Sequence, residues 1–144
     1  MSNPSSPRIA VGVELWSDSA RALIRTAAAF ARQFAAPWLA IVVSDSTHTL
    51  SLLTMEQQER IRENTDLVMS LGGVPFFCEG DDVAQTLIAT ATANGVELLI
   101  LGKPRDRGVI SRMLHPEIST AVLHRAADLW LMFAAYPESH AASR

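Results

Sequence analysis

Cysteine is nearly absent from this chain of 144 residues, which carries only Cys78. A single cysteine cannot form an internal disulfide, so Cys78 is interpreted as a core residue in a protein of a reducing compartment. Long hydrophobic runs are lacking too, because no apolar stretch approaches the roughly 20 residues that span a bilayer. Residues 1–7 have neither the basic start nor the apolar segment of a signal peptide. We therefore expect a cytoplasmic protein without membrane insertion.

Positive charge is scarce. Twelve Lys and Arg residues face 15 Asp and Glu residues, which gives a net charge of −3 and disfavours nucleic acid as a partner. Catalytic signatures are missing as well: the four histidines show no metal-ligand spacing, and the chain has neither a nucleophile elbow nor a Walker loop. We expect no catalytic residues and no metal.

What the sequence does contain is an alternation of short apolar runs and helical patterns, with 49% hydrophobic residues overall. The pattern predicts strands at 9–13, 38–43, 74–78, 98–101 and 129–133, and helices at 20–35, 55–71, 83–93 and 117–127. Strands that alternate with helices favour parallel pairing, so we predict one α/β sandwich over residues 8–134. Residues 1–7 and 135–144 are expected to be flexible. Pro75 predicts that the third strand lies at a sheet edge.

A basic loop follows the fourth predicted strand. Four of the twelve basic residues, including the only lysine, lie between Lys103 and Arg112, directly after Gly102. A buried strand that opens into a glycine-led cationic loop is typical of an anion site, with phosphate as the first ligand to suspect. In doubly wound sheets ligands bind beyond the carboxyl ends of the strands, where the strand order reverses. The alternative is a solvated surface loop.

The segment from Gly80 to Gly102 resembles the third helix and fourth strand of the universal stress protein family, and the likeness extends over almost the whole chain. More narrowly, the Gly-Lys-Pro-Arg sequence at 102–105 is similar to the universal-stress-like domain of Kdp-type potassium sensor histidine kinases. The resemblance implies the adenine nucleotide alpha hydrolase-like sandwich, a five-stranded parallel sheet of order 3-2-1-4-5. It also implies a homodimer through the last strand, 129–133, and a signalling protein as a further partner.

ATP-binding members of that family carry a spaced glycine motif that this chain keeps only in part. Gly102 matches its first glycine, whereas Arg105 stands at the second and His115-Pro116 at the final Gly-Ser or Gly-Thr pair. Pro116 has no N–H to offer a phosphate. The aspartate that the family often places near the end of the first strand is replaced by Val13-Glu14. The resemblance therefore implies weak ATP binding at most.

Some sensor-kinase domains of this type bind cyclic di-AMP through a Ser-x-Ser sequence after the first strand. Ser17 and Ser19 match it, although serines at these positions are more simply explained as caps of the following helix. The corresponding stretch of the second strand, 38–42, shares only its aromatic start and central alanine. Trp16 is expected either to cover a ligand base or to fill the crevice. The predicted cofactor contacts are Val13, Glu14, Ser17, Ser19, Val43, Gly102, Lys103, Arg105 and Arg107.

The function predicted from these residues and this resemblance is a non-enzymatic sensing or signalling module of the universal-stress type. Its candidate ligand is an adenine nucleotide, either cyclic di-AMP or weakly bound ATP. Two alternatives stay open: a slow nucleotide hydrolase, and an interaction protein that binds no small ligand. The chain is interpreted as either a stand-alone relative or an excised domain of a larger kinase.

Overall fold

A computed structural model describes residues 8–45, 52–102, 123–126 and 129–134. Within these ranges the chain forms three helices and a sheet of six strands in the order β3-β2-β1-β4-β6-β5. The elements are β1 (Ile9–Gly12), α1 (Ala20–Gln33), β2 (Trp38–Ser44), α2 (Met55–Ser70), β3 (Val74–Glu79), α3 (Val83–Ala93), β4 (Leu98–Gly102), β5 (Leu123–Ala126) and β6 (Leu129–Ala134).

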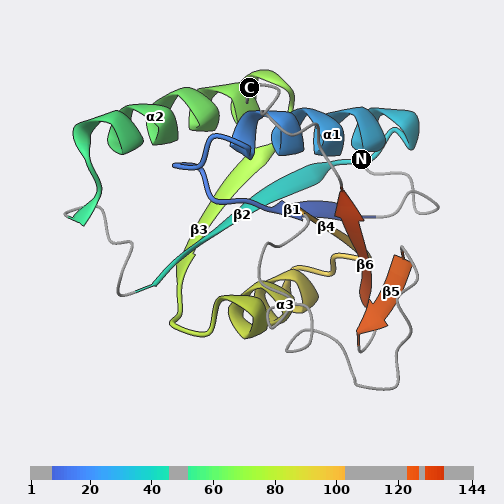
Figure 1. The fold of residues 1–144 in the computed structure, drawn as a ribbon. Helices are drawn as coiled ribbons and strands as arrows, with labels where there is room; N and C mark the ends of the chain where they lie inside the picture. The colour runs from blue at the N-terminus through green and yellow to red at the C-terminus, as the bar shows by residue number, and fades with distance from the viewer. Residues whose placement is uncertain (1–7, 46–51, 103–122, 127–128, 135–144) are drawn as a thin grey trace, which may run out of the picture.

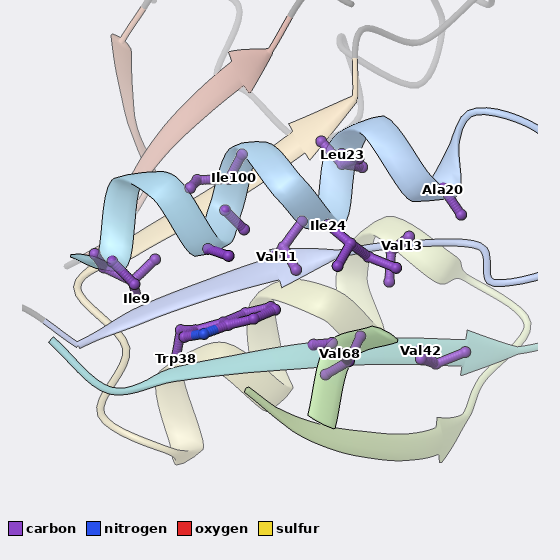
Figure 2. Close-up of a cluster of buried hydrophobic side chains, with 14 of the residues drawn as sticks. Ile9, Val11, Val13, Ala20, Leu23, Ile24, Trp38, Val42, Val68 and Ile100 are labelled. Atoms are coloured by element: carbon purple, nitrogen blue, oxygen red, sulfur yellow. The ribbon is translucent and has the colours of Figure 1, made fainter. Parts of the chain in front are cut away.

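The sheet is covered on both faces. Helices α1 and α2 lie on one face and α3 lies on the other (Figure 1). Successive residues of β1 pack against the helices on opposite faces of the sheet, because side chains of a strand point alternately to the two faces. Val11 packs in the cluster beneath α1 with Ile24 of that helix (Figure 2), whereas Ala10 packs in the cluster that contains Leu87 of α3. Burial on both faces explains why the central strands are apolar throughout.

Local sequence signals fix most helix boundaries. The Asp82 side chain caps α3 by accepting a hydrogen bond of 3.1 Å from the Gln85 N–H, which agrees with the predicted helix start at 83. Helices α2 and α3 are followed by Gly72 and Gly95, whose φ angles of 89° and 70° are in the left-handed region that glycine tolerates. The predicted ends of both helices are thereby confirmed.

The predicted five-stranded parallel sheet is confirmed. Strands β3, β2, β1, β4 and β6 are parallel neighbours, which is the order 3-2-1-4-5 when the last of them is counted as the fifth. Strand β3 lies at the edge, as Pro75 predicts. A prolyl ring has no N–H, so it weakens a strand least where that side of the backbone faces away from the sheet.

The predicted helix at 117–127 is wrong where the structure describes it. Residues Leu123–Ala126 form β5, which pairs antiparallel with β6, and the other residues of the predicted helix lie outside the described ranges. The physical reason is tertiary. The outer side of β6 carries a row of backbone donors and acceptors, and a preceding strand satisfies them, whereas a helix would leave them unpaired.

The prediction that 129–133 is an exposed edge is wrong for the same reason. Strand β6 lies between β4 and β5, and Leu131 is fully buried. The predicted homodimer through this strand therefore loses its physical basis, because β5 occupies the side on which a second copy would pair. Within the described ranges, the edges of the sheet are β3 and β5.

Candidate functional site at the carboxyl ends of β1, β2 and β4

The strand order reverses between β1 and β4. From β1 the chain builds outward through β2 to β3 and then crosses back to β4 on the other side of β1 (Figure 1). Gly12, the last residue of β1, is in register with Ile41 of β2 and Leu101 of β4. The carboxyl ends of these parallel strands thus meet at one end of the sheet, which is where doubly wound folds bind ligands.

Gly12 keeps the floor of this end tightly packed. A Cβ atom added there would lie 2.7 Å from Leu101 Cδ2 and 2.9 Å from Leu87 Cδ2. A larger residue would require the side chains of Leu101 and Leu87 to shift. Close packing therefore favours glycine at this position.

The backbone beyond β1 turns back into the protein. The Val13 N–H extends the ladder by donating to the Ile41 carbonyl at 3.1 Å, and Glu14 is exposed. Leu15 and Trp16 are then buried, with 1% and 9% of their surfaces accessible. Of the two roles considered for Trp16, filling the crevice is the one that its burial favours.

Two polar side chains of α2 hold this segment in place. Asn64, which is 8% exposed, donates from Nδ2 to the Leu15 carbonyl at 2.9 Å. Arg60 donates from Nη1 to the Trp16 carbonyl at 3.1 Å, and its Nη2 lies 3.1 Å from Asp18 Oδ1. Neither residue is predicted from the sequence, because polar side chains on an amphipathic helix give no local sign that they reach a distant loop.

Ser17 and Ser19 are joined to each other. Their hydroxyl oxygens are 2.8 Å apart, and the Ser19 N–H donates to Ser17 Oγ at 3.0 Å. Ser19 precedes α1 as its N-cap residue, yet its side chain makes no capping hydrogen bond. The interpretation of Ser19 as a side-chain cap is therefore wrong, and both hydroxyls are part-buried at the start of the helix.

The structure brings most of the described candidates to one end of the sheet. Val13 and Val43 are buried there at 5% and 6% exposure, so their side chains belong to the core beneath the site. Gly102 ends β4 in register with Ala134 and is half-buried. The remaining candidates, which all belong to the basic loop, lie outside the described residues: Lys103, Arg105 and Arg107.

Other features of the described residues set limits on the chemistry. Among them no cluster of His, Cys, Asp and Glu is arranged to hold a metal ion. An open hollow of about 270 Å³ is lined by Arg21 of α1 and by Glu63, Asn64 and Leu67 of α2. It thus shares Asn64 with the contact to the Leu15 carbonyl. In the part of the chain that the structure covers, no helix is long and apolar enough to cross a membrane.

Comparisons with known proteins agree with this architecture. The sequence model of the universal stress protein family matches residues 6–127. A search of curated proteins finds no match. Among solved structures, a universal stress family protein from Burkholderia pseudomallei is 22% identical with a TM-score of 0.58, over 78% of this chain and 90% of that one.

Two further solved structures contain nucleotides. The universal stress protein of Archaeoglobus fulgidus in complex with dAMP is 18% identical with a TM-score of 0.52, over 74% of this chain and 88% of that one. A universal stress protein in complex with cAMP is 17% identical with a TM-score of 0.50, over 67% and 72% of the two chains. At these identities the likeness to solved structures establishes the fold.

Proposed function

The chain belongs to the universal stress protein family, and we propose that it is a non-catalytic module that binds an adenine nucleotide at the carboxyl ends of β1, β2 and β4. One observation carries the proposal. Gly12, Gly102 and the segment after β1, whose Leu15 carbonyl is bound by Asn64, come together where the strand order reverses. Two family structures of the same fold hold adenine nucleotides, dAMP in one and cAMP in the other.

The basic loop supports a phosphate-bearing ligand of modest size. Lys103 follows Gly102 directly and Arg105 comes two residues later, so both are close in sequence to the end of the strand that borders the site. ATP is the less favoured nucleotide, because His115-Pro116 replaces the small pair that would cradle the terminal phosphates and Pro116 has no N–H. A mononucleotide or cyclic di-AMP has no terminal β- and γ-phosphates, so it does not need the contacts that this pair would make.

Calorimetric titration with cAMP, cyclic di-AMP and ATP tests the proposal. We expect ATP to bind with a Kd of about 0.1 mM or weaker and at least one of the other nucleotides to bind more tightly. Replacing Lys103 and Arg105 by alanine should weaken that binding. Raising the salt from 0.01 to 0.15 M should weaken it too, since the Debye length falls from about 30 to about 8 Å. Tight magnesium-dependent ATP binding would contradict the expected preference for cAMP or cyclic di-AMP over ATP.

The alternatives make different predictions. A slow hydrolase would release phosphate from ATP above a blank, and the Lys103→Ala variant would lose that turnover. An interaction protein without a small ligand would give no heat with any of the three nucleotides. The narrower likeness of 102–105 to Kdp-type sensor kinases rests on those four residues alone and stays a prediction, as does a signalling partner.

A further inference from the structure

Among the residues that the structure describes, strand β3 combines an open edge with exposed apolar side chains. It is the terminal strand on its side of the sheet (Figure 1), and its sequence is Val-Pro-Phe-Phe-Cys-Glu. Val74 is 55% exposed, Phe76 37% and Phe77 56%. Natural sheets protect their edges with charges, bulges or covering elements, whereas the only charge on this strand is Glu79 at its end.

Hydrogen bonds to β2 reveal which backbone groups of β3 point outward. The Gly80 N–H, just after the strand, donates to the Ser44 carbonyl of β2 at 3.0 Å. In a parallel ladder alternate residues bond to the same neighbour, so residues with even numbers use their backbone groups on β2. Pro75, Phe77 and Glu79 therefore direct their backbone groups away from the sheet. Pro75 fits this assignment, because the N–H that it lacks would have faced outward.

We propose that β3 pairs antiparallel with β3 of a second copy of this chain, on a two-fold axis that passes beside Phe77. In this register the Phe77 N–H of each copy donates to the Phe77 carbonyl of the other. The Glu79 N–H of each copy donates to the Pro75 carbonyl of the other. All three outward-facing residues are used, and the missing N–H of Pro75 costs the dimer only two reciprocal bonds, one for each copy.

Charge and aromatic packing favour this antiparallel arrangement. Each Glu79 stands opposite an uncharged Pro75, so the two carboxylates lie at opposite ends of the paired strands, whereas parallel pairing would bring them together. Directly opposed aromatic side chains stabilise a strand pair. Phe77 lies on the face of α2, because Cys78, the next residue, is directed toward α3, where its Sγ is 3.6 Å from Thr90 Oγ1.

A second copy fits this edge better than the ends of the same chain. Residues 1–7 contain Pro4 and Pro7, which cannot donate to a ladder, and only one large apolar residue, Met1. Residues 135–144 follow β6, which lies four positions from β3 in the strand order, and they are mostly small or polar. Neither segment offers an apolar run like that of β3.

Light scattering and sedimentation of the full chain test the dimer. We expect a dimer with a Kd of about 1–100 μM, typical of a small interface. The variants Phe77→Lys and Phe77→Glu should each raise the Kd at least about tenfold, because like charges would stand directly opposite each other. An equimolar mixture of the two variants should recover the dimer. The control Met55→Lys changes an apolar residue that is 81% exposed on α2 and should leave the mass unchanged.

Disulfide trapping tests the register without relying on affinity. In a Cys78→Ala background, Phe77→Cys should form an inter-chain disulfide under mild oxidation, because directly paired Cα atoms lie about 5.5 Å apart. Phe76→Cys in the same background should not, since Phe76 stands opposite position 78 of the other copy. Equal trapping at both positions would overturn the register.

Three outcomes would overturn the dimer itself. A wild type that stays monomeric at about 0.3 mM excludes the pairing, because that concentration exceeds the expected Kd. A dimer that survives both charged variants of Phe77 uses another surface. A mass that keeps growing with concentration indicates head-to-tail association of β3 with β5. Nucleotide binding plays no part in these measurements, so the dimer and the proposed function can fail independently.

Discussion

Asn64 shows what one buried polar residue does in this fold. It is the single polar or charged residue that is buried among those the structure describes, and its amide satisfies the carbonyl of Leu15. A buried carbonyl without a donor is costly, so the side chain fixes where the segment after β1 lies. The residue thereby links α2 to the candidate site, although it is on a different element from every predicted contact.

We predict that Asn64→Ala destabilises the protein by about 1–3 kcal/mol, because the Leu15 carbonyl would lose its donor inside the core. Urea unfolding monitored by circular dichroism measures the loss. Glu63→Ala, an exposed neighbour on the same helix, is the matched control and should change stability by less than about 0.5 kcal/mol. Equal unfolding midpoints for wild type and Asn64→Ala would show that the carbonyl finds another donor.

At the scale of the element, α2 has a local start signal that is complete in the sequence. Thr54 Oγ1 accepts a hydrogen bond of 3.0 Å from the Gln57 N–H, and Gln57 Oε1 accepts one of 2.9 Å from the Thr54 N–H. This reciprocal capping box satisfies two donors that the helix itself leaves unpaired. The predicted helix begins at the correct residue, Met55, although that prediction did not rest on the capping box.

We predict that Thr54→Ala lowers the free energy of unfolding by about 1 kcal/mol, since the cap loses its acceptor. Thr92→Ala is the control, because it makes the same change at an exposed position inside α3. That control should be neutral or slightly stabilising, as alanine is the better helix former. Chemical denaturation of both variants, with equal m-values, gives the comparison. A larger loss for Thr92→Ala would contradict this account of α2.

At the scale of the whole molecule, pairing with β5 makes β6 an interior strand of the sheet. Leu131 is in register with Leu99 of β4 on one side and His124 of β5 on the other, and it has no accessible surface. The strand that the sequence predicts as a dimer edge is therefore an interior strand. The open apolar edge is β3, at the opposite end of the sheet.

We predict that Leu131→Lys abolishes cooperative folding, because it buries an unpaired charge in the core beneath α3. If the strand were an exposed edge, the same change would give a folded monomer, so thermal unfolding followed with light scattering separates the two cases. Trp130→Lys is the control: its side chain is 39% exposed, so a folded protein with a modest loss of stability is expected. A folded Leu131→Lys monomer would restore β6 as an edge.

The sequence by itself determined the features that depend on near neighbours. The apolar run 9–13 had to be a buried strand, Asp82 had to cap a helix, and Gly72 and Gly95 had to follow helix ends, because each signal acts within a few residues. The five parallel strands followed from their alternation with helices. The family likeness around 80–102 then gave their order.

Only the tertiary structure decided what depends on residues far apart in the chain. Whether 123–126 became helix or strand depended on the open backbone of β6, which overrode the local helical pattern. Asn64 acquired its role because folding brought it to Leu15, 49 positions away in sequence. Local propensities amount to less than about 1 kcal/mol per residue, whereas an unpaired buried backbone group costs about 1–3 kcal/mol, so long-range pairing prevailed over the local helical pattern at 123–126.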